Sequence, residues 1–236
     1  PSRLDAVRFP NKPLKLINNK EMILHVYEAA KKSNTGEVFV ATPDQKIIDL
    51  IKNSGGNAVA TASNHQTGTD RIFEVFKNQL NSEPGIIINL QGDMPNIDAQ
   101  SITNLVTYMK EDKCDIGTLA STFSTKLEFE DENNVKVATH EKLAANNFVK
   151  ATDFFRAPLE TNKNLYHHIG IYAFTNKALV RYVSLKRSNL ELKRKLEQLR
   201  ALENNMSIHV GYISSSPLSV DTEKDLIEVK KLMENN

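Results

Sequence analysis

The stretch "GIIINLQGDMP", residues Gly85 to Pro95, decides the fold of this chain. Its apolar run reads as a fully buried strand, yet the strand ends on the carboxylate of Asp93. In a parallel sheet, ligands collect outside the carboxyl ends of the strands. Mg²⁺ binds through one or two carboxylates plus substrate phosphates, so an aspartate at that edge suits a nucleoside triphosphate. The alternative is a simple turn in which Asp93 accepts hydrogen bonds from local amides.

Helical and strand patterns alternate on both sides of this stretch. Apolar stripes at helical spacing predict helices at residues 22–30, 47–51, 72–80 and 102–109. Short apolar runs predict strands at residues 37–42, 57–61 and 85–90. Strand–helix alternation of this kind predicts a mostly parallel sheet with helices on both faces, which is a three-layer α/β/α, Rossmann-like arrangement.

The pattern changes after Cys114, where short alternating runs predict antiparallel strands and a small extra sheet from about residue 120 to 175. A helix rich in lysine and glutamate is expected over Leu190–Glu203, followed by the strand "SIHVGYI" and a C-terminal helix from Thr222. We therefore expect residues 1–236 to form a single domain that carries a β-rich insertion.

Composition excludes several classes of protein. The chain has 236 residues, with 40% hydrophobic and 25% charged residues, as in an ordinary globular protein. A net charge of +1 gives no electrostatic reason to expect nucleic acid or membrane as the main partner. The single cysteine, Cys114, favours a reducing compartment, hence the cytoplasm. No signal peptide or membrane-spanning run is visible, and the first residue, Pro1, suggests that an N-terminal piece has been removed.

The opening segment "PSRLDAVRFPNKPL" gathers Arg3, Arg8 and Lys12 among three prolines. Cations on a stiff loop suit a polyphosphate, although no glycine-rich run precedes the lysine as in a Walker motif. A solvated basic loop is the alternative.

Two further segments combine hydrogen-bonding residues with a helix start. In "NHQTGTDR", Thr69 could cap a helix, and the exposed amides there could receive phosphate or read a base. In "SVDTEKDL", Asp221 could be a second metal ligand, but Asp221 or Thr222 would also serve as an N-cap.

Two other motifs carry weaker signals. His167 and His168 are adjacent in a strand, so their side chains point to opposite faces, and no His/Cys spacing suits zinc. The run "LKRKLEQLR" is most simply a solvated helix, but Glu197 or Gln198 could point inward toward a pocket.

Taken together, six motifs in the same order resemble the 3-deoxy-manno-octulosonate (Kdo) cytidylyltransferase, or CMP-Kdo synthetase, family along nearly the whole chain. The motifs read "PSRLDAVRFPNKPL", "HQTGTDR", "QGDMP", "HIGIY", "LEQLR" and "VDTEKDL". The resemblance implies a nucleotidyltransferase that makes CMP-Kdo and pyrophosphate from CTP and Kdo for lipopolysaccharide synthesis. It also implies Mg²⁺ as cofactor and a homodimer formed through the β-rich region.

The resemblance also implies roles for individual residues. Asp93 and Asp221 are expected to hold the metal, and Arg3 and Lys12 to neutralise the phosphates, so these four would be the catalytic set. The nucleotide is expected along Gln66, Thr67, Gly68 and Arg71. The sugar acid is expected to face Arg8, Gln91, Arg156, His168, Tyr172, Glu197 and Gln198.

Several positions depart from the family pattern. The family's apolar strand before the first motif has no counterpart, so a protein that starts at Pro1 is expected to lack a central strand. Asn11 replaces a glycine, which is tolerable at a positive φ. Met94 replaces a glutamate, Phe155 a serine, and Arg194 a common glutamate. These changes leave two alternatives open: a cytidylyltransferase for sialic acid or an amino analogue of Kdo, and a non-catalytic nucleotide-binding homologue.

Overall fold

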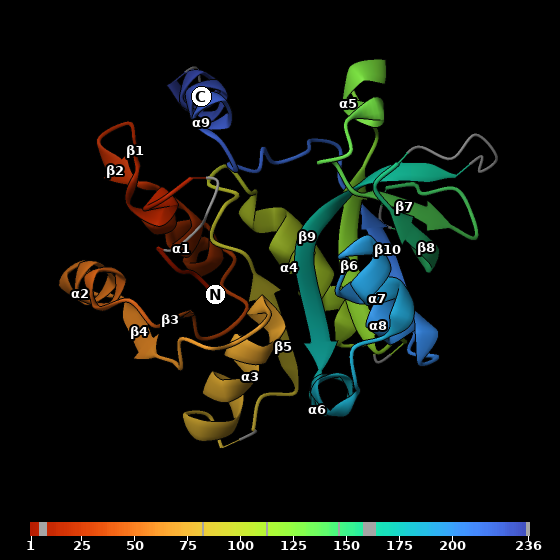
Figure 1. Cartoon of the computed structure of the whole chain (residues 1–236), viewed down its shortest axis with the longest axis horizontal. Helices are drawn as coiled ribbons and strands as arrows, with labels where there is room; N and C mark the ends of the chain where they lie inside the picture. The colour runs from red at the N-terminus through yellow and green to blue at the C-terminus, as the bar shows by residue number, and fades with distance from the viewer. Residues whose placement is uncertain (5–8, 82, 112, 146, 158–163, 235–236) are drawn as a thin grey trace. The chain divides into compact units, whose positions relative to one another are not determined.

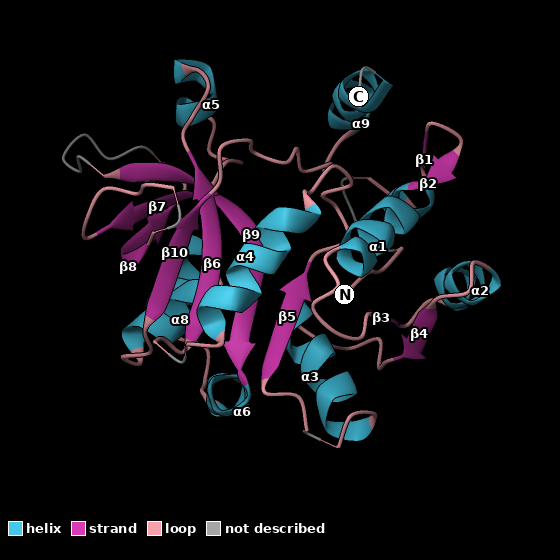
Figure 2. Cartoon of the chain, turned by 180° about the vertical axis from the view of Figure 1, so that it is seen from behind, coloured by secondary structure: helices cyan, strands magenta, loops and turns pink. Residues whose placement is uncertain are grey.

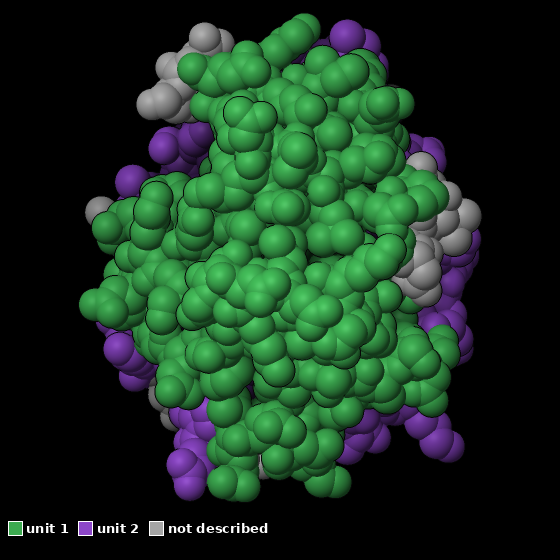
Figure 3. Space-filling view, turned by 90° about the vertical axis from the view of Figure 1, so that its left-hand side faces the viewer, with its two compact units in different colours: residues 1–82, 89–103, 217–236 green, residues 83–88, 104–216 purple. Residues whose placement is uncertain are grey.

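The computed structural model describes residues 1–4, 9–81, 83–111, 113–145, 147–157 and 164–234. The chain divides into two compact units, which Figure 3 shows in different colours. Unit 1 comprises Pro1–Ser82, Asn89–Thr103 and Pro217–Asn236, and unit 2 comprises Glu83–Ile88 and Asn104–Ser216. Among the described helices, none is both long and apolar enough to cross a membrane.

The elements alternate in the first half and become β-rich in the second (Figure 1). The strands are β1 (Leu16–Ile17), β2 (Lys20–Glu21), β3 (Phe39–Thr42), β4 (Asn57–Ala60), β5 (Ile86–Leu90), β6 (Ile116–Ser121), β7 (Lys136–Thr139), β8 (Phe148–Phe155), β9 (Leu165–Thr175) and β10 (Ile208–Tyr212). The helices are η1 (Lys12–Leu14, 3₁₀), α1 (Met22–Lys32), α2 (Gln45–Asn53), α3 (Gly68–Asn78), α4 (Ala99–Met109), α5 (Lys126–Glu130), α6 (Asn176–Ser184), α7 (Asn189–Arg194), α8 (Gln198–Glu203) and α9 (Glu223–Glu234).

Unit 1 is built from helices around the parallel pair β3–β4. Apolar residues of α1, β3 and α2 form one buried cluster, as their helical and strand spacing predicts. The members of this cluster are Ile23, Leu24, Val40, Ile47 and Ile51. The N-terminal segment runs beside β3, since the amide of Ser2 donates to the carbonyl of Ala41 at 3.0 Å.

A six-stranded sheet in the order β5-β9-β6-β10-β8-β7 organises unit 2. Because β7 also pairs with β9, the strands β9, β6, β10, β8 and β7 form a closed ring of pairings. Helix α4 covers one face of the sheet, and α7 and α8 cover the other (Figures 1 and 2). Gly117 of β6 permits the close approach of α4, since a Cβ there would lie 2.7 Å from Met109 Sδ.

The expected mixed α/β fold with a β-rich part is confirmed, but two details of the sheet differ. In the described pairings only β3–β4 and β6–β10 are parallel. The described strands therefore pair mostly in the antiparallel sense, which differs from the mostly parallel sheet that we expected. The antiparallel strands also join β6 and β10 in one sheet rather than forming a separate one. Strand β5 is only partly buried except at Asn89, because it is the first strand of the sheet order and has one described neighbour.

The helix expected over Leu190–Glu203 is wrong as a continuous element. Lys195 adopts a left-handed conformation with φ 56° and ψ 47°, which separates α7 from α8. The buried Glu191 and Arg200 form an ion pair across this break, with Arg200 Nη2 2.6 Å from Glu191 Oε1. A tertiary ion pair therefore joins the two short helices on either side of the break. Helices α5 and α6 were not predicted.

Candidate active site

Three charged side chains from distant parts of unit 1 meet at one place. Lys12 begins η1, Asp93 follows β5, and Asp221 precedes α9. The Lys12 Nζ donates to Asp93 Oδ2 at 3.2 Å and to Asp221 Oδ1 at 3.0 Å. The two carboxylates that the sequence proposed as metal ligands are therefore close enough to share one cation.

Local backbone features place Lys12. Asn11 adopts the left-handed conformation with φ 57° and ψ 20°, so the expectation for this glycine replacement is confirmed. Pro13, inside η1, restricts the backbone just after the lysine. The side chain of Lys12 is only 14% exposed, so its ammonium is held against the two aspartates rather than solvated as in a simple basic loop.

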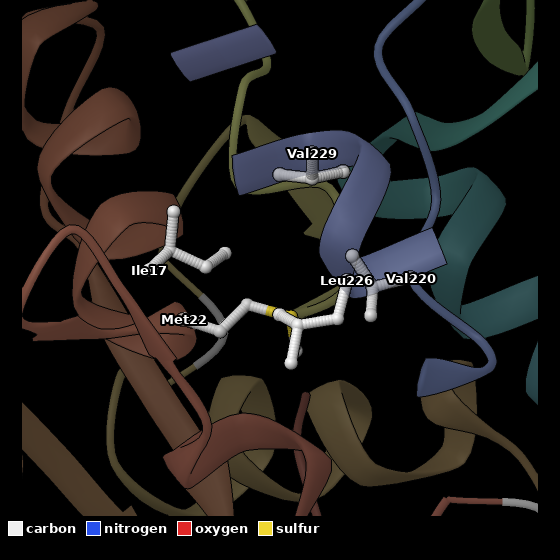
Figure 4. Packing of buried hydrophobic residues seen from close by; sticks show 5 residues of the cluster. All are labelled: Ile17, Met22, Val220, Leu226 and Val229. Atoms are coloured by element: carbon white, nitrogen blue, oxygen red, sulfur yellow. The ribbon is translucent and has the colours of Figure 1, made fainter. Parts of the chain in front are cut away.

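A backbone bridge and a core cluster place Asp221. The amide of Val220 donates to the carbonyl of Asp93 at 2.9 Å, which brings the next residue beside that aspartate. Val220 is also buried in an apolar cluster with Ile17, Met22, Leu226 and Val229. Figure 4 shows the side chain of Met22 reaching towards Leu226 and Val220. Burial of this cluster thus fixes the segment that carries Asp221.

Neighbours of Asp221 take part in capping α9. The amide of Asp225 donates to Thr222 Oγ1 at 3.3 Å, and Asp225 Oδ2 accepts from the amides of Asp221 and Thr222 at 2.9 and 2.8 Å. Thr222 and Asp225 therefore cap α9 in the manner of a capping box. One carboxylate oxygen of Asp221, Oδ1, accepts from Lys12.

The charges of the site act on Lys12. Burial by itself lowers the pKa of the Lys12 ammonium, but the charges and hydrogen bonds of Asp93 and Asp221 outweigh it. The pKa of Lys12 is therefore raised above its ordinary value, and the lysine is a cation at neutral pH. A cation of fixed position beside two carboxylates can neutralise a polyphosphate that approaches them.

The donor set fits a metal that nucleotide phosphates complete. No group of three or more His, Cys, Asp and Glu residues suited to a metal occurs among the described residues. Mg²⁺ needs only one or two carboxylates when substrate phosphates supply further oxygen ligands, and the pair Asp93 and Asp221 meets that need. Met94 adds no ligand, since its side chain is 4% exposed and packs in the core.

The "HQTGTDR" segment forms a loop that leads into α3. Thr67, rather than Thr69, is the N-cap of this helix, since its Oγ1 accepts from the amide of Asp70 at 3.1 Å. Thr69 is buried and accepts from Asn89 Nδ2 at 3.2 Å. Gln66 is exposed at the loop, ahead of Gly68, the first residue of the helix.

Two pairings hold this loop in place. His65 Nε2 forms a short hydrogen bond with Glu74 Oε2 on α3. Arg71 is buried, and its Nη1 donates to Thr61 Oγ1 at 2.6 Å and to the carbonyl of Ala62 at 2.9 Å. At least part of the guanidinium of Arg71 therefore supports the loop itself. Sequence patterns did not single out His65 or Glu74. These residues lie nine positions apart, His65 before the start of α3 and Glu74 within it.

The remaining predicted residues divide between the two units. Arg3 is exposed on the N-terminal segment, and Gln91 precedes Asp93, both in unit 1. Arg8 lies outside the described residues. The others lie in unit 2: Arg156, His168, Tyr172, Glu197 and Gln198.

The buried His168 and the half-buried Tyr172 form an aromatic pair on β9. Their ring centroids lie 5.4 Å apart, and His168 Nε2 lies 3.0 Å from Thr118 Oγ1 on β6. Burial, with a smaller contribution from His167, lowers the pKa of His168 to about 3. Burial and the charge of Glu197 raise the pKa of Tyr172. Both rings are therefore neutral hydrogen-bonding groups near pH 7.

The expectation that His167 and His168 point apart is consistent with their contacts. His167 Nδ1 lies 2.9 Å from Glu128 Oε1 on α5 and 3.2 Å from Ser216 Oγ. Because the glutamate and the serine share one ring nitrogen, this group lacks the relay geometry of a catalytic triad.

The helix break at Lys195 places the two polar residues of "LEQLR". Gln198 is buried at the start of α8, and the carbonyl of Glu197 accepts from Tyr182 Oη at 3.0 Å. The buried pair Glu191–Arg200 closes the turn that carries them. Sequence reasoning missed Arg200, although it is the last residue of that motif.

Comparison with known proteins identifies the family of this chain. Residues 1–208 match the family described as Cytidylyltransferase. A 3-deoxy-manno-octulosonate cytidylyltransferase of Bartonella quintana (strain Toulouse) is 41% identical over 239 residues, covering 99% of this chain and 96% of the relative. The protein of that name from Thermodesulfovibrio yellowstonii (strain ATCC 51303 / DSM 11347 / YP87) is 39% identical over 244 residues, with the same coverage.

Solved structures extend the comparison to the fold. A structure described as CMP:2-keto-3-deoxy-manno-octonic acid synthetase complexed with CTP superimposes with a TM-score of 0.88 at 34% identity, covering 99% of this chain and 96% of that one. A putative glucose-1-phosphate thymidylyltransferase from Bacillus anthracis shares the fold alone, with a TM-score of 0.68 at 15% identity over 96% of this chain and 87% of that one. Because the match to the synthetases runs through the whole chain, the protein belongs to the 3-deoxy-manno-octulosonate cytidylyltransferase, or CMP-Kdo synthetase, family.

Proposed function

We propose that this chain transfers the cytidylyl group of CTP to Kdo, which yields CMP-Kdo and pyrophosphate and activates the sugar for lipopolysaccharide synthesis. The anomeric hydroxyl oxygen of the sugar forms a bond to the α-phosphorus. The bond from that phosphorus to the oxygen leading to the β-phosphate breaks, and the hydroxyl proton is released. The observation that carries this proposal is the meeting of Lys12 with Asp93 and Asp221 in a member of this family.

The chemistry needs positioning and charge neutralisation rather than a covalent intermediate. Asp93 and Asp221 would hold Mg²⁺, which supplies positive charge to the triphosphate and to the attacking oxygen when it is bound. Lys12 and Arg3 would neutralise the phosphates. The loop residues Gln66, Thr67 and Gly68, with Arg71 behind them, would receive the nucleotide at the N-terminus of α3.

The sugar acid would bind through residues of two kinds. Arg156 and Arg8 offer cations for its carboxylate, since arginine binds carboxylates in a bidentate manner. His168 and Tyr172, which are neutral near pH 7, would bind sugar hydroxyls without adding charge. Glu197 and Gln198, which also belong to unit 2, would add polar side chains, and Gln91 of unit 1 stays a prediction from the sequence.

A pyrophosphate-release assay tests the proposal. The enzyme is incubated with Mg²⁺, with CTP or UTP, and with Kdo, an amino analogue of Kdo or sialic acid. Release with CTP and Kdo above all other pairs is the expected result. Faster pyrophosphate release with the amino analogue or with sialic acid would identify that sugar, and not Kdo, as the acceptor. Absence of pyrophosphate release with every acid sugar would favour a non-catalytic nucleotide-binding homologue.

We also propose that the protein works as a cytoplasmic homodimer whose contact is the β-rich region at about residues 120–175. The support is the exposure of Leu127 on α5, which is 79% exposed although apolar. Light scattering at micromolar concentration should give twice the mass of the chain. Leu127→Glu should shift that mass towards the monomer, whereas a monomeric wild-type protein would contradict the proposal.

A further inference from the structure

Lys136, the first residue of β7, is a fully buried lysine that sequence reasoning did not single out. Its exposed fraction is 0%, and its ammonium donates only to backbone carbonyls among its described hydrogen bonds. The acceptors are Asp131 O at 2.7 Å, Asn134 O at 2.8 Å and Arg156 O at 2.7 Å. One cation thus ties the loop before β7 to the end of β8.

Arg156 holds the same loop from the other side. Its Nη1 donates to the carbonyl of Glu132 at 3.1 Å and to that of Asn133 at 3.3 Å. Four consecutive carbonyls, at residues 131–134, are therefore bound by two cations. We call residues 131–134 the carbonyl loop.

This arrangement brings the buried ammonium of Lys136 close to a second positive charge, the partly exposed guanidinium of Arg156. Burial lowers the pKa of Lys136, the charges of Asp131 and Glu132 oppose that change, and the charge of Arg156 lowers it further. A buried ammonium is costly unless its donors are satisfied, and an apolar residue here would leave three carbonyls without this donor. The three hydrogen bonds of the Lys136 ammonium therefore suit a role in holding the backbone of Arg156 in one position.

Strand register shows which residues Lys136 can hold. It is paired with Phe155 of β8, the residue before Arg156, and with His167 of β9, the residue before His168. Lys136 therefore lies between the two strands that carry the proposed ligands of the sugar acid, and it binds one of those ligands through its carbonyl.

We propose that Lys136 is a positioning residue that fixes Arg156 and the carbonyl loop for binding the carboxylate of the acid sugar. This inference rests on the proposed function, because that function assigns the carboxylate to Arg156. Lys136 itself does not contact substrate in this scheme and acts through the backbone of Arg156.

Kinetics of Lys136→Met and Lys136→Arg test the proposal. Methionine removes the ammonium, and arginine keeps the charge but replaces three convergent donors with a planar fork. We expect the KM for the acid sugar to rise at least about tenfold, because a shift of about 1 Å in a binding group can cost about 10²-fold. The KM for CTP should stay within about twofold if only the carboxylate site moves. Lys150→Met, an exposed lysine on β8, is the matched control and should change neither value.

Hydrogen exchange separates this inference from the proposed function. In both Lys136 variants, the amides of the carbonyl loop should exchange faster than in the wild type, whichever substrate the enzyme uses. An inactive wild type with faster exchange in the variants would defeat the proposed function but leave Lys136 as the residue that holds the loop. Unchanged exchange, an equal rise of both KM values, or loss of folding in both variants would overturn the inference.

Discussion

Two lysines of this protein are withdrawn from solvent, and their surroundings shift their pKa values in opposite directions. Lys12 lies against Asp93 and Asp221, and its pKa is raised. Lys136 lies against three backbone carbonyls, and its pKa is lowered. Full counter-charges outweigh the cost of burial, whereas carbonyl dipoles only reduce it. The position of Lys12 beside two carboxylates suits a site that binds charged groups. The position of Lys136 among carbonyls suits a residue that holds the backbone in place.

A third buried cation, Arg200, forms a direct ion pair with a buried carboxylate. Arg200 is 3% exposed and binds Glu191 through two hydrogen bonds, Nε to Oε2 at 2.8 Å and Nη2 to Oε1 at 2.6 Å. Arg200→Met should lower the free energy of unfolding by about 3–5 kcal/mol, because it leaves a buried carboxylate without its main partner. Urea unfolding followed by circular dichroism measures the change.

The control for that prediction lies on the same glutamate. Arg187 Nε also binds Glu191 Oε1, at 3.0 Å, but the side chain of Arg187 is 43% exposed. Arg187→Met should cost less than about 1 kcal/mol, as exposed pairs do. If both substitutions lowered the free energy of unfolding equally, burial would not decide how much these ion pairs contribute to stability.

Substitution of one carboxylate tests the role proposed for the site around Lys12. Asp93→Asn and Asp221→Asn should each lower turnover by about 10²–10³-fold, the usual loss for one preorganised electrostatic contact. Stability should change by less than about 1 kcal/mol, because Lys12 offsets the like charges and neither carboxylate is fully buried. Asp98→Asn, an exposed aspartate five residues after Asp93, is the control. Asp221→Asn with near-normal turnover would leave Asp93 as the single metal ligand.

Removing the cation instead gives a different pattern. Lys12→Met should lower turnover by up to about 10²-fold because the phosphates lose one neutralising charge. Binding of Mn²⁺ without nucleotide should not weaken, and it should tighten if the ammonium competes for the same carboxylates. Titration followed by electron paramagnetic resonance measures this affinity. Lys136→Met should leave it unchanged, and weaker Mn²⁺ binding in Lys12→Met would show that Lys12 supports the metal site.

The smallest expected effect is the pH dependence that comes from Lys136. Its folded pKa lies below the ordinary value of 10.5, so the unfolded chain binds more protons between those two values. The contribution of Lys136 to stability should therefore rise as pH increases towards 10.5. The free energy of unfolding of the wild type relative to Lys136→Met, measured from pH 7 to 10.5, should increase with pH. Asp131, Glu132 and Arg156 are the neighbouring charges, and a difference that falls over this range would refute the lowered pKa.

Sequence alone was sufficient to propose the candidate site residues and to predict most elements of the first half of the chain. Apolar spacing predicted α1 to α4, and the six ordered motifs named Asp93, Asp221 and Lys12 before any contact was known. These signals are local, because helix stripes, strand runs and turn chemistry depend on neighbours within a few residues. The position of Asp93 at the end of β5 follows from the strand pattern in the same way.

Only the tertiary structure decided the contacts that give those residues their properties. Lys12 meets Asp93 and Asp221 across 81 and 209 positions of the chain, and no local pattern records such a pairing. The break at Lys195 is spanned by the ion pair between Glu191 and Arg200, and local helix propensity predicts neither the break nor the pair. The carbonyls around Lys136 are invisible to sequence reasoning altogether, because every residue carries a carbonyl and only folding decides which of them converge on one ammonium.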